Sequence, residues 1–296
     1  MKEDDFISTI KGQTCSIIGL GLMGGSLAAA LHGMFHTIIG YDLRPEYVKI
    51  AVEKNYIDKG TSHLSEAIKE ANIIVLATPM RVILNMIDEI SSILPNKSIV
   101  MDLGSVKVPV VEKMQSLPDE IQIIGGHPMC GREKSGIEAV DPHLFKNAPF
   151  ILTPAARTSR NTIDLLSFLI QSIGARPLML EAERHDLLVA AISHLPYLIA
   201  CNLVSTAEII ALKDAELWDI ASSGFRDTTR LAASNVEMSL DILWTNKDRI
   251  LDMTHLFQEQ LTSFITLLEN NDEDMLRDYL SSVQNIRKHL FVSLPS

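Results

Sequence analysis

The feature that most constrains this chain is its segment 15–42, in which a glycine motif stands between two apolar runs. The first run, residues 15–18, is typical of a buried parallel strand. The motif G-x-G-x-x-G follows at once, and the small residues after it favour a helix that packs close to a sheet. The second run, residues 37–41, ends in Asp42. This order of strand, glycines, helix, strand and acid predicts a βαβ unit that binds a dinucleotide.

Each glycine of the motif has its own physical role. Gly19 permits the tight turn, Gly21 lets the backbone approach a pyrophosphate, and Gly24 lets helix and strand pack closely. The helix N-terminus offers free N–H groups and the positive end of its dipole to the phosphates. Asp42 is placed to accept hydrogen bonds from the hydroxyls of an adenosine ribose. The expected cofactor contacts are therefore Gly19, Gly21, Leu22, Met23, Gly24, Asp42 and Arg44.

The acid at position 42 also bears on the choice of cofactor. A carboxylate accepts a hydrogen bond from the 2′-hydroxyl of NAD and repels the 2′-phosphate of NADP. Arg44, two residues later, works in the opposite direction, because a guanidinium group binds a phosphate. We therefore expect NAD as the cofactor, with NADP as the weaker ligand.

The composition argues against a membrane, secreted or nucleic-acid-binding protein. The segment between Lys11 and Asp42 contains no Asp, Glu, Lys or Arg and exceeds the roughly 20 residues that a transmembrane helix needs. Glycines and histidines interrupt this segment, which argues against a transmembrane helix. The acidic N-terminus does not suit a signal peptide, and the net charge of −11 opposes a general nucleic-acid surface. The three cysteines are odd in number and far apart, without metal-ligand spacing. We expect a cytoplasmic protein that binds neither membrane, nucleic acid nor metal.

The pattern of elements changes once along the 296 residues, which are enough for two domains. Strand and helix signals alternate up to Leu180, as in an α/β domain with a mostly parallel sheet. Beyond Leu180 the pattern is helical. We therefore expect an α/β domain over residues 1–180 and an all-helical domain over residues 181–296.

The helical part opens with an uncharged run, residues 187–207. Its length again suits a membrane span, but polar residues interrupt it, so we expect a helix buried in a helical domain or a dimer core. Pro196 should kink this helix and leave carbonyl groups unpaired. Because kinked helices with polar side chains often line cavities, His194 is a candidate site residue.

Other candidates follow the expected strands of the sheet, where the carboxyl ends line the ligand crevice of such folds. Thr78 and Pro79 follow one strand, although Pro79 also suits the start of a helix. Ser105 follows the next strand, and spacing alone favours a simple helix N-cap for it. His127 follows the strand expected at residues 121–125, on the same edge of the sheet. That shared edge makes His127 a candidate catalytic residue.

A later segment places two arginines four residues apart. Arg226 and Arg230 lie on one face if a helix begins there, and two guanidinium groups can hold a dicarboxylate. The alternative is that they pair with Asp227, Glu237 or Asp241 on a solvated surface.

Six short motifs together resemble one known family. They are GLGLMGGSLA at 19–28, ATP at 77–79, DLGSVK at 102–107, GGHPMCGREKSG at 125–136, SHLP at 193–196 and GFRDTTRLA at 224–232. Over nearly its whole length the chain resembles the prephenate/arogenate dehydrogenase family of tyrosine biosynthesis. The resemblance implies an α/β Rossmann domain followed by an all-α helical dimerisation domain, and hence a homodimer.

The resemblance also implies a reaction and a set of roles. In this family a cyclohexadienol is oxidised at C4, a hydride passes to NAD(P)⁺, and CO₂ leaves as the ring becomes aromatic. By similarity, His127 is the base at the 4-hydroxyl, and Ser105 bridges that hydroxyl and the nicotinamide. Arg230 binds a substrate carboxylate, and His194 lines the pocket near the side chain. Arg132 and Arg226 add local cations to an acidic chain.

The choice between prephenate and arogenate is less constrained. Glu133 matches an acidic position that influences which side chain is accepted, and a carboxylate there attracts the ammonium of arogenate. Arg132 and Lys134 flank Glu133 and can neutralise it by pairing, so we expect prephenate as substrate, with arogenate or dual use as alternatives. Some members carry a tryptophan where this chain has Ser239, so the packing around the side chain differs.

Two other classes of protein compete with this interpretation. A β-hydroxyacid dehydrogenase or imine reductase also opens with this glycine motif, but should carry a catalytic lysine on the interdomain helix. No lysine occurs between Arg184 and Lys213. A non-enzymatic NAD sensor is opposed by the presence of His127, Ser105 and Arg230 together.

Overall fold

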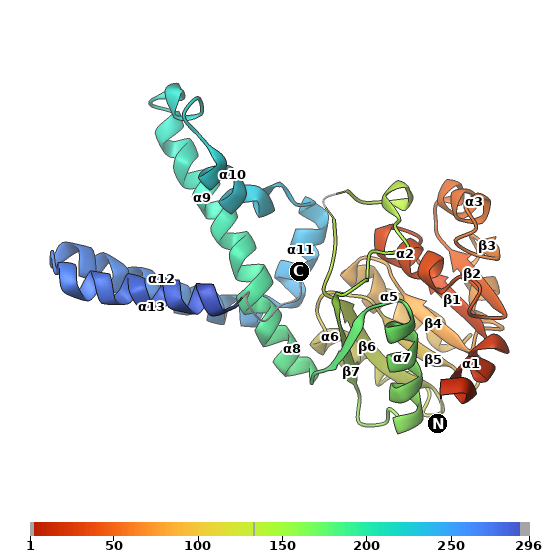
Figure 1. The fold of residues 1–296 in the computed structure, drawn as a ribbon. Helices are drawn as coiled ribbons and strands as arrows, with labels where there is room; N and C mark the ends of the chain where they lie inside the picture. The colour runs from red at the N-terminus through yellow and green to blue at the C-terminus, as the bar shows by residue number, and fades with distance from the viewer. Residues whose placement is uncertain (1–2, 133, 291–296) are drawn as a thin grey trace. The chain divides into compact units, whose positions relative to one another are not determined.

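A computed structural model describes residues 3–132 and 134–290, and its contacts group the chain into two units, residues 1–247 and 248–296. The first unit contains one eight-stranded sheet with helices on both faces (Figure 1). The strands are β1 (Thr14–Ile18), β2 (Thr37–Tyr41), β3 (Lys59–Thr61), β4 (Ile73–Leu76), β5 (Ile99–Asp102), β6 (Gln122–Pro128), β7 (Pro149–Pro154) and β8 (Arg176–Met179).

The sheet has the strand order β3-β2-β1-β4-β5-β6-β7-β8. Neighbours from β3 to β6 pair in parallel, whereas β7 runs antiparallel to β6, and β8 runs parallel to β7. At its centre, Ile17 of β1 is in register with Gly40 of β2 and Val75 of β4. This order is that of a doubly wound dinucleotide-binding sheet, and the expected fold class is confirmed.

Two separate apolar clusters, one on each face of the sheet, form the core. The first lies under α1 (Glu3–Lys11), α2 (Leu22–Leu31), α3 (Pro45–Glu53) and α7 (Arg160–Ser172). The second lies under α4 (Leu64–Ile68), α5 (Met80–Ser91) and α6 (Val108–Met114). Strands buried on both faces need nearly continuous apolar runs, which is why β4 consists of Ile, Ile, Val and Leu alone.

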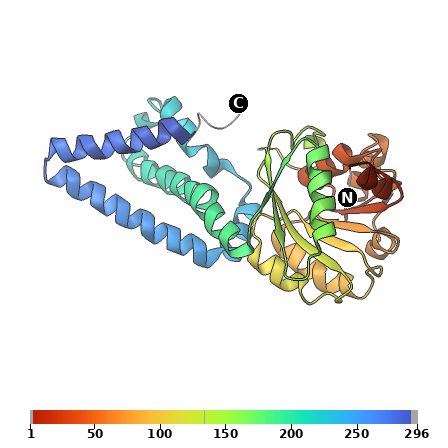
Figure 2. The ribbon, with the colours of Figure 1, turned by 60° about the horizontal axis from the view of Figure 1, so that its bottom comes forward.

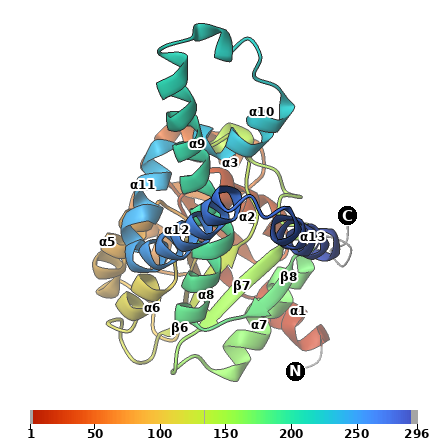
Figure 3. The same cartoon turned by 90° about the vertical axis from the view of Figure 1, so that its left-hand side faces the viewer.

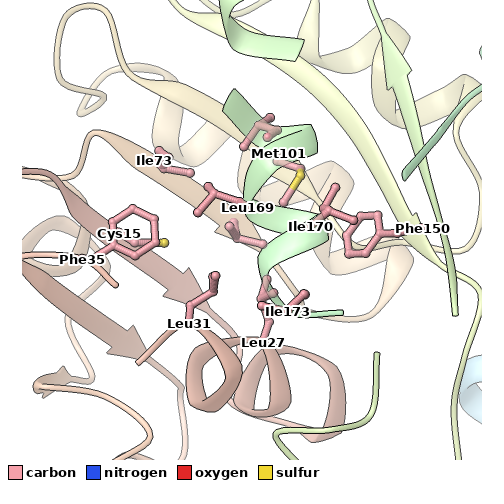
Figure 4. A pocket seen from close by; sticks show the side chains of 12 residues that line it. Cys15, Leu27, Leu31, Phe35, Ile73, Met101, Phe150, Leu169, Ile170 and Ile173 are labelled. Carbon is pink, nitrogen blue, oxygen red and sulfur yellow. The ribbon is translucent and has the colours of Figure 1, made fainter. Parts of the chain in front are cut away.

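The first cluster encloses a small cavity of about 20 Å³ between the sheet, α2 and α7 (Figure 4). Its lining is apolar and includes Cys15, Leu31, Phe35 and Phe150. A cavity without polar partners does not hold an ordered water, so this space belongs to the packing of the core. Complete burial raises the pKa of the Cys15 thiol to about 12, which makes Cys15 a packing residue and not a nucleophile.

Some elements differ from the sequence-based expectation. The short edge strand β3 (Lys59–Thr61) pairs with β2, although no apolar run marks it in the sequence. Strand β6 continues to Pro128, beyond the expected end at Gly125, because its antiparallel pairing with β7 extends to the Pro128–Phe150 pair. His127 therefore lies inside a paired strand, opposite Ile151 of β7.

From Ala182 to Leu290 the chain is helical. The first unit continues with α8 (Ala182–Val189), a π-helical turn η2 (Ala190–His194), α9 (Leu195–Ala211), α10 (Ser223–Thr229) and α11 (Val236–Thr245). The expected kink at Pro196 is replaced by the π turn that precedes it. Pro196 stands in the first turn of α9, where its missing N–H group is not needed.

The helical stretch Ala182–Ala211 is long and apolar enough to cross a membrane, and 22% of its most apolar window is buried. Length and composition are weak grounds for a membrane span, since the core helix of an oligomer has the same properties.

The second unit is a helical hairpin of α12 (Lys247–Glu269) and α13 (Glu273–Leu290), joined by a short turn (Figure 2). The Phe264 and Tyr279 rings meet with their centroids 5.6 Å apart. The Asp272 carboxylate accepts a hydrogen bond from the Met275 N–H at 3.0 Å and so caps the N-terminus of α13.

Candidate active site

The glycine loop after β1 is shaped for a close backbone approach. A Cβ on Gly24 would lie 1.9 Å from the Gly19 carbonyl oxygen, and Gly19 itself has φ +101° with a Cβ position 2.9 Å from Thr78 Cγ2. Only glycine fits at these two positions. A Cβ on Gly21 would meet no atom of the described residues within 4 Å, and no side chain caps the N-terminus of α2 there. This open, uncapped helix terminus fits a pyrophosphate.

Asp42 fastens the glycine loop to the end of β2. Its Oδ2 accepts from the Leu20 N–H at 2.9 Å, and its Oδ1 accepts from the Arg44 backbone N–H and Nε, each at 3.0 Å. The hydrogen bond to Asp42 raises the pKa of Arg44, whose guanidinium carbon lies 3.5 Å from the Tyr47 ring centroid. Since both oxygens already accept hydrogen bonds, a ribose hydroxyl would compete with Arg44 for Oδ1.

Thr78 and Pro79 lie at the carboxyl end of β4, beside Gly19. Pro79 is also the N-cap residue of α5, so the structural role considered for it is present. Thr78 Oγ1 lies 3.6 Å from the Met86 sulfur. Leu22 and Met23 begin α2 and are partly exposed at the same edge.

A fully buried ion pair lies at the carboxyl end of β5, the next strand of the sheet. Lys107 Nζ pairs with Asp102 Oδ2 and donates to the Gly126 carbonyl at 2.7 Å. Asp102 also accepts from the Gly104 N–H at 2.7 Å and the Gly126 N–H at 3.2 Å. Burial raises the pKa of Asp102 and lowers the pKa of Lys107, while their mutual attraction opposes both shifts. These bonds hold the loop after β5, which carries Ser105, against Gly126, the residue before His127 in β6.

Ser105 does not cap the helix that follows it, so that prediction is wrong. The N-cap residue of α6 is Lys107, and the acceptor for this helix end comes from α8. Asp186 Oδ1 accepts from the Lys107 N–H at 2.7 Å, and Oδ2 accepts from the Val108 N–H at 2.8 Å. A carboxylate there is favoured by the helix dipole. Ser105 is left partly exposed at the edge of the sheet.

The same carboxylate begins a chain of hydrogen bonds that reaches His127. Asp186 Oδ1 lies 2.7 Å from His185 Nδ1, and His185 Nε2 lies 2.8 Å from His127 Nδ1. The two imidazole rings meet edge to face, with centroids 5.0 Å apart. Figure 3 shows α8, which carries this pair, passing beside β6 and α6. His185 and Asp186 are buried, whereas His127 is partly exposed.

His194 joins this network from the π turn. The Asn246 amide nitrogen donates to the Asp186 carbonyl at 2.9 Å and lies 3.2 Å from His194 Nδ1. A nitrogen that faces a carbonyl must be the amide donor, so His194 Nδ1 accepts and Nε2 carries the proton. Burial, with a smaller effect of His185, lowers the pKa of His194 to about 4, although Asp186 opposes the shift.

The electrostatics also keep His127 neutral. Loss of hydration lowers its pKa well below 6.5, and His185, Lys107 and His194 act in the same direction. An imidazole that is neutral at physiological pH has a lone pair ready to accept a proton.

Sequence reasoning missed three members of this network: His185, Asp186 and Asn246. An adjacent His-Asp pair directly before a long uncharged run was the available signal for the first two. Nothing local marks Asn246, because its role depends on α11 meeting α8 in the fold.

The candidate substrate arginines lie elsewhere on the surface. Arg132 pairs with Asp141, and Arg226 Nε lies 3.2 Å from Asp227 Oδ1. The expected shared α-helical face is interrupted, because α10 ends at Thr229 and Arg230 opens a 3₁₀ turn. This turn and α10 pack against α9, the helix that begins just after His194. Glu133 lies outside the described residues.

Across residues 3–132 and 134–290, no cluster of three His, Cys, Asp or Glu side chains is arranged to hold a metal ion.

Comparisons with known proteins agree over both parts of the chain. Residues 26–179 match the family model "Prephenate dehydrogenase, nucleotide-binding domain", and residues 181–282 match "Prephenate dehydrogenase, dimerization domain". A prephenate dehydrogenase of Bacillus subtilis is 34% identical over 281 residues, covering 94% of this chain and 76% of the relative.

Two solved structures have nearly the same fold. Prephenate dehydrogenase from Aquifex aeolicus, in complex with hydroxyphenyl propionate and NAD⁺, superposes with a TM-score of 0.88 at 31% identity, covering 94% of this chain and 98% of that one. Synechocystis arogenate dehydrogenase superposes with a TM-score of 0.81 at 30% identity, covering 94% and 99%. The similarity thus spans relatives named for either of the two substrates.

Proposed function

Because the chain belongs to the prephenate dehydrogenase family of oxidoreductases, we propose that it catalyses the NAD-dependent oxidative decarboxylation of prephenate. The observation that carries this proposal is His127, a neutral imidazole at the carboxyl edge of the sheet, hydrogen-bonded through His185 to a buried carboxylate. It stands on the same edge as the open glycine loop. A base beside a dinucleotide site is the arrangement that alcohol oxidation requires.

In this proposal the protein orients the substrate and removes one proton. His127 accepts the proton of the 4-hydroxyl, and Ser105 binds the same oxygen. NAD⁺, when bound, accepts the hydride from C4. Loss of the ring carboxylate as CO₂ makes the ring aromatic, which supplies the driving force, and His127 returns its proton to the resulting phenolate oxygen. Placement of the reacting groups then accounts for much of the rate.

The substrate's two carboxylates need cations in a chain with a net charge of −11. We assign the main contact to Arg230, with Arg132 and Arg226 as neighbouring cations. His194 presents an Nε2–H donor, because its Nδ1 is occupied by Asn246. Such a donor suits the keto oxygen of a pyruvyl side chain better than the ammonium of arogenate. We keep Glu133 as the residue that influences whether prephenate or arogenate is accepted, with use of arogenate as the alternative.

For the cofactor we propose NAD, as in the Aquifex aeolicus complex. The uncapped terminus of α2 would receive the pyrophosphate, with Thr78 and Pro79 nearby. Asp42 would hold the ribose hydroxyls, and Arg44 would move aside from Oδ1. The Asp42 carboxylate supports NAD, because it accepts a hydrogen bond from a 2′-hydroxyl and repels a 2′-phosphate.

We propose a homodimer built by residues 181–296, with residues 1–180 as the nucleotide-binding domain. The dimerization-domain match and the large exposed apolar side chains along α9, Leu203, Ile209 and Ile210, support this assembly. Apolar patches of this kind are normally covered in soluble proteins. A cytoplasmic location stays a prediction.

The absorbance at 340 nm tests the proposed function directly. Purified protein with prephenate and NAD⁺ should raise it, and should do so more slowly with NADP⁺ or with arogenate. No rise with either substrate and either cofactor would contradict the proposal. A kcat/KM higher with arogenate would keep the family and overturn the choice of substrate.

A further inference from the structure

We infer that His185 and Asp186 form a proton relay behind His127, which fixes the nitrogen that His127 turns to the substrate and shares the proton it receives. The inference deepens the proposed function, since it rests on His127 being the base. It assigns positioning roles to two residues that the sequence motifs do not include.

The hydrogen-bond geometry allows a single arrangement of protons when both rings are neutral. A carboxylate only accepts, so His185 Nδ1, 2.7 Å from Asp186 Oδ1, must carry a proton. His185 Nε2 is then a lone pair. His127 Nδ1, 2.8 Å away, must therefore donate to it. The remaining nitrogen of His127, Nε2, is left as the proton acceptor.

The same chain offers a path for the proton after the reaction. The substrate hydroxyl proton bonds to His127 Nε2 as the O–H bond breaks. The Nδ1 proton of His127 then moves to His185 Nε2. His127 ends neutral with its proton on Nε2, and His185 becomes an imidazolium ion paired with Asp186. As CO₂ leaves and the ring becomes aromatic, the phenolate oxygen takes the proton back from His127 Nε2, and the proton on His185 Nε2 returns to His127 Nδ1, which restores the starting arrangement.

Asp186 is held in place independently of the histidines. Its two oxygens accept the Lys107 and Val108 N–H groups, which close the N-terminus of α6. The carboxylate is thus fixed at the positive end of a helix dipole. Other charged or titratable groups facing the relay are Lys107 and Asp102 from the corner after β5, and His194 from the π turn. Asp186 is therefore the anion that balances a proton held on His185.

Substitutions at His185 separate acceptor and packing roles. His185→Leu removes the acceptor for His127 Nδ1, and kcat should fall by about 10²–10⁴-fold with little change in the Kd of NAD⁺. His185→Gln keeps an acceptor oxygen, so it should recover an order of magnitude or more of that loss. His36→Gln, at an exposed histidine of the same unit, is the matched control and should be neutral. A kcat for His185→Leu near that of the wild type, or no recovery with Gln, would overturn the relay.

The pH profile is a readout that a purely structural role would not move. Without the anion, a proton on the histidine pair is less stable. Asp186→Asn should therefore shift the acid limb of kcat/KM to lower pH by about one unit or more. If the acid limb of the Asp186→Asn variant stays at the wild-type pH and only the maximum kcat/KM falls, Asp186 has a structural role instead.

The tautomer can be read without any reaction. In ¹⁵N-histidine-labelled wild-type protein, assigned by comparison with His127→Asn, His127 Nδ1 should be protonated and Nε2 unprotonated. A proton on Nε2 in the free protein would overturn the inference. This measurement decides the relay even if a variant fails to fold. It also separates the two proposals, since a wild type without dehydrogenase activity would refute the function and leave the tautomer result standing.

Discussion

His127 and His194 are both neutral near pH 7, yet they present different atoms. The bond to His185 leaves His127 a lone pair on Nε2, whereas the bond to Asn246 leaves His194 an N–H donor. One side chain therefore suits removal of a proton, and the other suits an oxygen acceptor on the substrate. Neighbouring hydrogen-bond partners, and not the residue type, decide which role each histidine takes.

Burial of neutral His194 should also make stability depend on pH. Its pKa is about 4 in the folded protein against 6.5 for an exposed histidine. The unfolded chain therefore binds the proton more tightly, and stability from this group is complete above pH 6.5 and lost as pH falls toward 4. The slope should reach about 1.4 kcal/mol per pH unit. Urea unfolding should show a smaller acid loss for His194→Gln; equal losses would contradict this pKa.

At the scale of elements, the buried Asp102–Lys107 pair joins the end of β5 to the start of α6 and to β6. Lys107→Met leaves a buried carboxylate without its cation, and should destabilise the fold by about 3–5 kcal/mol. Adding Asp102→Asn should recover most of this loss, because an amide oxygen still accepts from the Gly104 or Gly126 N–H.

The exposed pair Lys113–Asp88 provides the control for this comparison. Lys113→Met should cost less than about 1 kcal/mol, since solvent screens such pairs. Chemical denaturation of the four proteins measures the difference. A loss for Lys107→Met as small as that for Lys113→Met would show that the buried pair does not stabilise this corner.

Elements encoded locally were predictable, and contacts between distant elements were not. The glycine loop and Asp42 follow from a turn, a helix end and a strand that are adjacent in sequence. The roles of Asp186 and Asn246 depend on α8 and α11 meeting α6 and the π turn, which no local periodicity encodes. The length of β6 likewise depends on its pairing with β7. The π turn before Pro196 was missed because a proline predicts a break but not how the chain accommodates it.

At the scale of the whole molecule, the proposed homodimer would cover the exposed apolar side chains of α9. We expect light scattering to report about twice the chain mass of 32.8 kDa. Ile209 is 58% exposed on α9, and Ile209→Asp should shift the protein toward the monomer. Val52→Asp changes an exposed apolar residue of α3 and should leave the mass unchanged. A wild-type monomer, or binding to lipid vesicles in place of self-association, would contradict the proposed dimer.

The most direct test of the central claim is the turnover of His127→Asn with prephenate and NAD⁺. Asparagine preserves size and polarity but has no basic nitrogen. The variant should therefore bind NAD⁺ with the wild-type Kd while its kcat falls by about 10²–10⁴-fold. His36→Asn, which removes an exposed histidine far from the proposed chemistry, should turn over like the wild type. A kcat of His127→Asn close to that of the wild type would show that His127 is not the base.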